Sequence, residues 1–224
     1  MATRIPRSEF NRRYDLPNWR MLNHTISTDF ACGDFAAGAE FVRQVAALAD
    51  EADHHPDLDL RYPGTVRVSI TSHDANGLTA RDAALASAID EFAWTRNFTG
   101  DPSRVATVEI AIDAMDIALV LPFWKALLGY VEEAPANVGD QVDALIDPGH
   151  RGPAVWFQQM DAPRPQRSRI HVDVRVPHDE AEAVIARAID AGGRLLSDAY
   201  ARAFWVLTDP EGNEACVCTW QDRD

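Results

Sequence analysis

The chain has 224 residues, of which 46% are apolar and 25% charged, and its formal net charge is −14 at pH 7. This length allows one large or two modest domains, and the composition is that of an ordinary globular protein. A strongly negative surface repels nucleic acids and anionic membranes, which argues against both as partners. No apolar run approaches the ~18 residues that span a bilayer, and no apolar segment makes the basic start a secretory signal. We therefore expect a cytoplasmic protein.

Strand and helix patterns alternate through the first hundred residues. The predicted elements are a strand at 21–31, a helix at 34–53, strands at 58–62 and 65–72, and a helix that starts after Leu78. Asp34 can cap the first helix, and Thr79 with Asp82 has the form of a capping box for the second. The Pro63-Gly64 turn makes the two adjacent strands antiparallel. We expect a domain at 1–100 of the α+β class, with a four-stranded antiparallel sheet and helices on one face.

Three of the seven histidines, His54, His55 and His73, fall in this region. The first two end a helix, because Pro56 disfavours helical backbone in the residue before it, and His73 follows a strand. The ends of elements gather around clefts, and an imidazole titrates near neutral pH, which suits proton transfer or metal binding. Each residue also has a structural interpretation: a histidine can complement the helix dipole, and Asp82 can serve only as a cap. The residues by themselves leave both interpretations open.

Several short motifs surround these histidines. They are Asp50-x3-His54-His55-Pro56, Tyr62, Ser72-His73-Asp74 and Gly77-Leu78-Thr79-x-Arg81-Asp82. Together they resemble the signature of the pterin-4a-carbinolamine dehydratases over about residues 14–98. Two departures concern the substrate pocket: the Pro63-Gly64 hairpin is one residue longer than expected, and Leu58 lies near the place of a family aromatic residue.

The resemblance implies elimination of water from a 4a-hydroxytetrahydropterin to give the quinonoid dihydropterin, by acid–base catalysis without a cofactor. It implies four catalytic residues, His54, His55, His73 and Asp82, and three substrate-binding residues, Asp50, Pro56 and Asp74. His54 and His73 would form the acid–base pair, His55 would position the substrate, and Asp82 would orient a histidine. The implied partners are a pterin, other copies of the chain, and the pathway of an aromatic amino acid hydroxylase. A Zn²⁺ ion bound by the three histidines is the alternative that residue type alone allows.

The second half of the chain repeats one pattern of elements after a predicted boundary at 100–104. The first copy has a strand at 105–112, a helix at 116–128 and strands at 142–146 and 154–159. The second copy has a strand at 170–176, a helix at 178–191 and strands at 203–207 and 215–219. Such an internal repeat predicts a second domain at 104–224 made of paired βαβββ modules that form one curved sheet.

The motifs of this half are Phe123-Trp124-x3-Leu127-Leu128-Gly129-Tyr130, His171-Val172-Asp173-Val174 and Asp209-Pro210-Glu211-Gly212-Asn213-Glu214. They resemble the glyoxalase/bleomycin-resistance, or vicinal-oxygen-chelate, superfamily over about residues 105–221. The resemblance implies a divalent metal held by strand side chains, here Glu109, His171 and Glu214. Cys216 stands where the superfamily has a glutamate, so a metal-free polar cleft lined by His171 and Glu109 is the alternative interpretation of these residues. The alternative function is a metal-dependent lyase or a small-molecule-binding protein that acts through this cleft, with the first domain as a dimerisation module.

Overall fold

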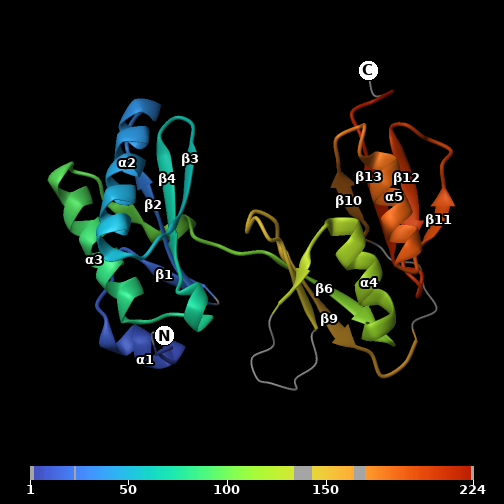
Figure 1. Cartoon of the computed structure of the whole chain (residues 1–224), viewed down its shortest axis with the longest axis horizontal. Coiled ribbons are helices and arrows are strands. Elements are labelled where there is room, and N and C mark those ends of the chain that lie inside the picture. Colours follow the sequence, from blue (N-terminus) through green and yellow to red (C-terminus); the bar gives the residue numbers. More distant parts are fainter. Residues whose placement is uncertain (1–2, 23, 134–142, 164–169, 223–224) are drawn as a thin grey trace. The chain divides into compact units, whose positions relative to one another are not determined.

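The computed structural model describes residues 3–22, 24–133, 143–163 and 170–222. The chain forms two compact units, Met1–Thr107 and Val108–Asp224 (Figure 1). None of the helices in the described ranges is long and apolar enough to cross a membrane.

The first unit is an antiparallel sheet with helices on one face (Figure 1). Its elements are α1 (Arg7–Arg13), β1 (Arg20–Leu22), β2 (Thr25–Ala31), α2 (Phe35–Ala52), β3 (Asp57–Arg61), β4 (Thr65–Ile70), α3 (Ala80–Thr95) and β5 (Gly100–Asp101), with 3₁₀ turns η1 (His73–Ala75) and η2 (Pro102–Arg104). The strand order is β1-β2-β4-β3, and β5 pairs with β2 beyond the end of β1. The sheet has five strands and not the predicted four, because the two-residue β5 adds to the edge that β1 forms; the predicted α+β architecture is confirmed.

Two local features of this unit differ from the sequence predictions. The single strand predicted at 21–31 is wrong, because β1 and β2 are separate strands that pair antiparallel with each other. No glycine or proline between them marks the turn. The interval 100–104, where a boundary is predicted, carries β5 and η2, and both belong to the first unit.

Two helices of the first unit, α2 and α3, begin where their caps predict, whereas α1 is not predicted and has no side-chain cap. Asp34 accepts a hydrogen bond from Ala37 N at 2.8 Å and starts α2, which buries Phe41 and Val45 against the sheet. Thr79 begins α3 with a complete capping box. Full burial of a side chain such as Phe41 stabilises the fold by about 1.5–3 kcal/mol, so this apolar face fixes α2 on the sheet. The C-terminus of α2 and the N-terminus of α3 are thereby held against the end of β4.

The second unit contains the same βαβββ order twice, as predicted. The first module is β6 (Glu109–Ala114), α4 (Ile117–Leu128), β7 (Val131–Glu132), β8 (Ala144–Ile146) and β9 (Ala154–Gln159). The second module is β10 (Val172–Arg175), α5 (Ala181–Asp190), β11 (Arg194–Ser197), β12 (Phe204–Thr208) and β13 (Glu214–Cys218). The sheet orders are β6-β9-β8-β7 and β10-β13-β12-β11, and the first pair of each is parallel.

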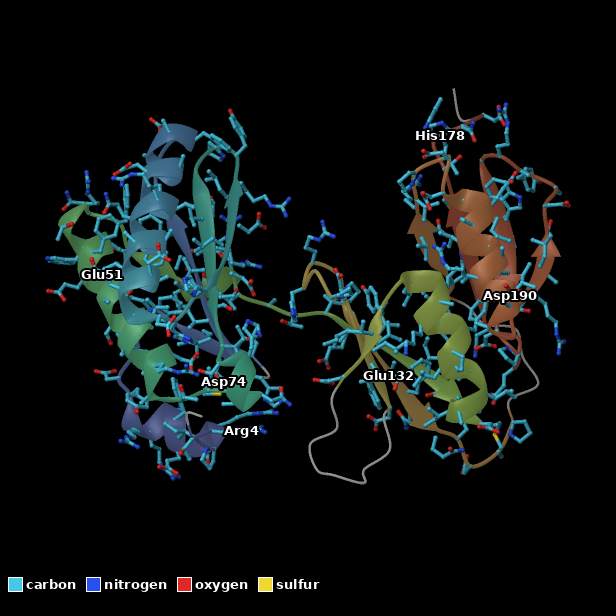
Figure 2. All side chains as sticks on the ribbon, in the orientation of Figure 1. Arg4, Glu51, Asp74, Glu132, His178 and Asp190 are labelled. Atoms are coloured by element: carbon cyan, nitrogen blue, oxygen red, sulfur yellow. The ribbon has the colours of Figure 1, made fainter. Side chains whose placement is uncertain are left out.

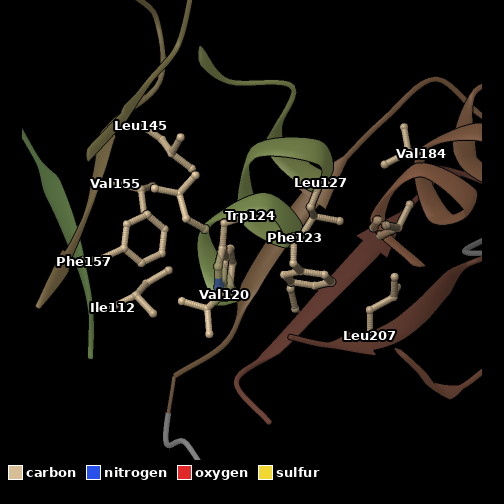
Figure 3. Close-up of a cluster of buried hydrophobic side chains, with 14 of the residues drawn as sticks. Ile112, Val120, Phe123, Trp124, Leu127, Leu145, Val155, Phe157, Val184 and Leu207 are labelled. Atoms are coloured by element: carbon tan, nitrogen blue, oxygen red, sulfur yellow. The ribbon is translucent and has the colours of Figure 1, made fainter. Parts of the chain in front are cut away.

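One hydrophobic core joins the two modules. Figure 3 shows side chains of α4 between those of the β6–β9 sheet and those of α5 and β12. Phe123 and Trp124 are almost fully buried there, and Trp124 Nε1 donates to Asp209 Oδ2 at 3.1 Å. Six residues of α4 are buried in this core, whereas Leu119, on another side of the helix, is 51% exposed; the helix therefore packs through one broad apolar face.

Several helices and strands of this unit begin at residues other than those predicted. The first strand begins at Glu109 and not at residue 105, and α5 begins at Ala181 because the residues before it form a turn in which Glu180 N bonds to Pro177 O. The predicted βαβββ order includes a strand at the places of β7 and β11, but no residue range is predicted for either, since neither has a clear alternation of buried and exposed residues. Val142, the predicted start of a strand, lies outside the described residues.

Candidate functional site

His54 and Asp82 form a buried pair between α2 and α3. The Nε2 atom of His54 lies 2.9 Å from Asp82 Oδ1, and the two side chains are 7% and 0% exposed. The chain reverses direction at Asp53, whose φ of 46° is left-handed, and His54 N then bonds back to Ala49 O at 3.0 Å. This is the hydrogen-bond pattern that closes many helices, and here it brings the imidazole to the start of α3.

Asp82 holds a fixed orientation because both of its oxygens are occupied. Its Oδ2 accepts from Ser72 Oγ at 2.7 Å, from Thr79 N at 2.6 Å and from Thr79 Oγ1 at 3.0 Å. Ser72 follows β4 and Thr79 caps α3, so one carboxylate joins the ends of three elements. A buried network in which every polar atom is hydrogen-bonded is rigid, so the contact with Asp82 also holds the His54 ring in one orientation.

The contact with Asp82 decides which nitrogen of His54 can exchange a proton. A carboxylate only accepts hydrogen bonds, so Nε2 carries the hydrogen in this pair. In the neutral ring Nδ1 then has the free lone pair, and in the charged ring Nδ1 has the second proton. The pair is thus chemically equipped to act as a general base or acid through Nδ1.

His55 lies next to His54 in sequence but in a different environment. Its Nε2 is 2.9 Å from Asp50 Oδ1, and the two side chains are 62% and 77% exposed. Pro56 is half-buried beside them. Exposed ion pairs of this kind contribute about 0–1 kcal/mol to stability, so this contact orients the imidazole more than it stabilises the fold.

His73 and Asp74 form the start of η1, directly after Ser72. Both side chains are exposed, and Asp74 accepts a hydrogen bond from the Arg81 guanidinium. Arg81 is the second residue of α3, so this pair ties η1 to that helix. Asp74 lies at the end of the unit where Arg4 and α1 are also found (Figure 2).

The structure thus brings together two pairs of the predicted residues, His54 with Asp82 and His55 with Asp50. Three residues that the site prediction does not include contact predicted site residues: Ser72 and Thr79 bond to Asp82, and Arg81 bonds to Asp74. Thr79 has a signal in the sequence, since it belongs to the capping box. Ser72 and Arg81 lie inside the quoted motifs, but no pattern assigns them a contact.

The predicted metal ligands of the second unit are only partly brought together. Among the described residues, the single group of His, Cys, Asp and Glu with its ligand atoms within metal-holding distance is His171, Asp173 and Cys216, within 4.8 Å of one another. Glu109, on β6, and Glu214, on β13, are not in this group. The sequence prediction missed Asp173, although its place two residues after His171 on a strand is a signal for a shared face.

Cys216 is the buried member of this group. Burial, with the carboxylate of Asp173 next and then the neighbouring Cys218, raises the pKa of its thiol to about 11. Cys32 in the first unit is also a buried thiol, and burial likewise raises its pKa to about 11. The donors at His171, Asp173 and Cys216 are a nitrogen, an oxygen and a sulfur, a set that fits a divalent transition metal.

The first unit is therefore an α+β domain with a buried histidine–carboxylate pair of the acid–base type, and the second is a paired βαβββ domain. Residues 3–92 match the family model for pterin 4 alpha carbinolamine dehydratase, and residues 109–218 match that for a glyoxalase-like domain. A putative pterin-4-alpha-carbinolamine dehydratase of Chloroflexus aurantiacus is 51% identical over 75 residues, which are 34% of this chain and 80% of that protein. Through its first unit, the chain belongs to the pterin-4a-carbinolamine dehydratase family.

Further similar proteins include one more curated relative and two solved structures. A putative pterin-4-alpha-carbinolamine dehydratase of a Roseiflexus species is 44% identical over 92 residues, 41% of this chain and 98% of its own length. A transcriptional coactivator/pterin dehydratase structure from Brucella melitensis covers 41% of this chain and 99% of its own, with 30% identity and a TM-score of 0.37. A glyoxalase/bleomycin resistance protein/dioxygenase family enzyme from Burkholderia phytofirmans covers 50% of this chain and 95% of its own, with 19% identity and a TM-score of 0.41.

Proposed function

We propose that the first unit is a hydro-lyase that dehydrates a 4a-hydroxytetrahydropterin to the quinonoid dihydropterin. The observation that carries the proposal is the buried His54–Asp82 pair, which fixes one imidazole in one tautomer within a chain of the dehydratase family. The reaction suits such a site, because it moves protons and needs no change of oxidation state.

The protons of this reaction balance without a cofactor. The C4a–O bond breaks with its electron pair on oxygen, and the leaving hydroxyl takes up one proton to become water. A ring N–H of the pterin gives up one proton, and its electrons form the new C=N bond. We assign these two transfers to His54, through Nδ1, and to His73. Each positioned group of this kind accelerates a reaction by about 10²–10⁴-fold.

The exposed residues of the region supply substrate contacts in this proposal. His55, oriented by Asp50, positions the pterin, and Pro56 and Asp74 line the same binding region. The proposed partners are a pterin from an aromatic amino acid hydroxylase pathway and further copies of the chain, as in the family that the sequence resembles. The proposed location is the cytoplasm, where the substrate class would be recycled.

The test measures dehydration of a 4a-hydroxytetrahydropterin by stopped-flow absorbance, against the spontaneous rate. We expect acceleration by the full chain, and a loss of about 10²–10⁴-fold in kcat for His54→Ala and for His73→Ala. His178→Ala is the control: His178 lies in the second unit, where its Nδ1 is 3.3 Å from Trp220 Nε1, and it belongs to neither proposed site. A wild-type chain that leaves the spontaneous rate unchanged would overturn the proposal, as would folded His54→Ala and His73→Ala variants with full activity.

A further inference from the structure

The second unit presents a nitrogen, an oxygen and a sulfur donor on one face of one sheet. His171 directly precedes β10 and Asp173 lies on it, two residues later, so their side chains share a face. Cys216 on β13 is the register partner of Asp173 in a parallel pair, which puts its side chain on that same face. The intervening Val172 packs on the hydrophobic core from the other side of the sheet. The strand register therefore brings Asp173 and Cys216 together, and the residue that directly precedes β10 adds the third donor.

The separations within the cluster are those of ligands around one ion. Cys216 Sγ lies 3.6 Å from His171 Nδ1, and Asp173 Oδ1 lies 3.0 Å from the same nitrogen. Metal bonds of about 2.3 Å to sulfur and 2.1 Å to nitrogen, at a tetrahedral angle, separate those two atoms by roughly 3.6 Å. The corresponding nitrogen–oxygen separation is roughly 3.4 Å, which a small side-chain rotation of Asp173 provides.

The cluster combines one buried ligand with two ligands that solvent can reach. Cys216 is buried, whereas the side chains of His171 and Asp173 are 54% and 46% exposed. An ion can reach the donor atoms from solvent and bind on this face of the sheet. Three protein ligands leave a coordination position for water or a small molecule, which is the arrangement of catalytic rather than structural zinc sites.

We propose that the second unit binds one thiophilic divalent ion of the Zn²⁺ type through His171, Asp173 and Cys216. A thiolate with an imidazole selects zinc and similar transition metals, whereas Mg²⁺ and Mn²⁺ prefer sites made of oxygen. This ligand set differs from the expected Glu109, His171 and Glu214, because it comes from one pair of neighbouring strands and includes sulfur. It is independent of the proposed dehydratase activity in the first unit.

The test is titration of the metal-free full chain with Co²⁺, followed by displacement with Zn²⁺. Cobalt reports its own ligands: a thiolate–Co²⁺ bond gives a near-ultraviolet charge-transfer band, and tetrahedral Co²⁺ gives strong visible bands. We expect one ion per chain, with both sets of bands, and their loss when one equivalent of Zn²⁺ is added. Mg²⁺ added in large excess should not displace the cobalt.

Cys216→Ser and Cys218→Ser form a matched pair of variants. Both cysteines lie on β13, two residues apart and buried, but only Cys216 belongs to the cluster. Loss of groups that merely support a ligand weakens metal binding by about 10–100-fold, so removal of the ligand itself should weaken Zn²⁺ binding by roughly 100-fold or more. The Cys218→Ser variant should keep the charge-transfer band and the wild-type Zn²⁺ affinity.

Three results would overturn the proposal. The first is a wild-type chain that binds Co²⁺ without a charge-transfer band, or not at all. The second is a band that disappears in Cys218→Ser and persists in Cys216→Ser. The third is equal Zn²⁺ affinity in wild type and in Asp173→Ala, since this result would show that the Asp173 carboxylate is not a ligand. Circular dichroism of each variant establishes that the second unit is folded in these comparisons.

Discussion

Replacement of Asp82 by asparagine should reverse the tautomer of His54 while the fold is kept. The amide has nearly the shape of the carboxylate, and its one oxygen can keep the three donors that Ser72 and Thr79 direct at Oδ2. The amide nitrogen then faces His54 Nε2 across the 2.9 Å contact. Two donors cannot share that contact, so the neutral ring must place its hydrogen on Nδ1. The atom proposed to take the proton is then blocked.

The expected size of this effect follows from the burial of the pair. Asp82 is 0% exposed, so solvent cannot replace the lost acceptor. Buried histidine–aspartate pairs in which asparagine imposes the wrong tautomer lose about 10⁴ in kcat, and a single acid–base group contributes about 10²–10⁴. We expect kcat for dehydration to fall within this range and KM to change little. Loss of charge from the network should cost about 1–3 kcal/mol of stability.

Three measurements test the Asp82→Asn prediction. Stopped-flow dehydration gives kcat and KM, urea titration gives stability, and ¹⁵N NMR of the imidazole shows which ring nitrogen carries the hydrogen. Asp90→Asn is the control, since Asp90 lies on the same helix and accepts from Trp19 Nε1 at 3.1 Å, away from the site. A folded Asp82→Asn variant with wild-type kcat, or with the hydrogen still on Nε2 of His54, would refute the reasoning.

Three further predictions concern stability. Burial raises the pKa of Asp90 above its ordinary value, against hydrogen bonds from Trp19 and Asn18 that lower it. The folded state therefore binds the Asp90 proton more tightly than the unfolded state, so the free energy of unfolding of the wild type should fall as pH rises from about 4 through the raised pKa. Urea titrations of Asp90→Asn should lack this fall. An equal pH slope in wild type and variant would contradict the prediction. Phe123→Ala should cost about 3–5 kcal/mol in chemical denaturation, because the ring is fully buried in the core that joins both modules; a cost below 1 kcal/mol would show that this core is not shared. Asp34→Ala should cost about 1 kcal/mol, since it removes the cap on Ala37 N, and Asp34→Asn should restore most of it.

Local signals in the sequence determined much of the architecture. Caps at Asp34 and Thr79 predict where two helices begin, because a cap needs only a side-chain acceptor and backbone a few residues away. The repeat of strand and helix patterns likewise predicts the paired βαβββ modules, because each pattern is read from residues close together in the sequence. The bounds of strands without such signals, β7 and β11 among them, escape prediction because their neighbours in the sheet stabilise them.

Contacts between residues distant in sequence were decided only by the tertiary structure. The sequence by itself brought His54, His55, His73 and Asp82 forward as candidates, from residue type, element ends and resemblance. It could not show that Asp82 reaches His54 and leaves His55 to Asp50, because that choice depends on the left-handed turn at the end of α2. In the second unit, likewise, the sequence proposed His171 as a ligand, whereas the parallel register of β10 with β13 decided that Asp173 and Cys216 stand beside it. Register is a property of two strands together, and neither strand alone encodes it.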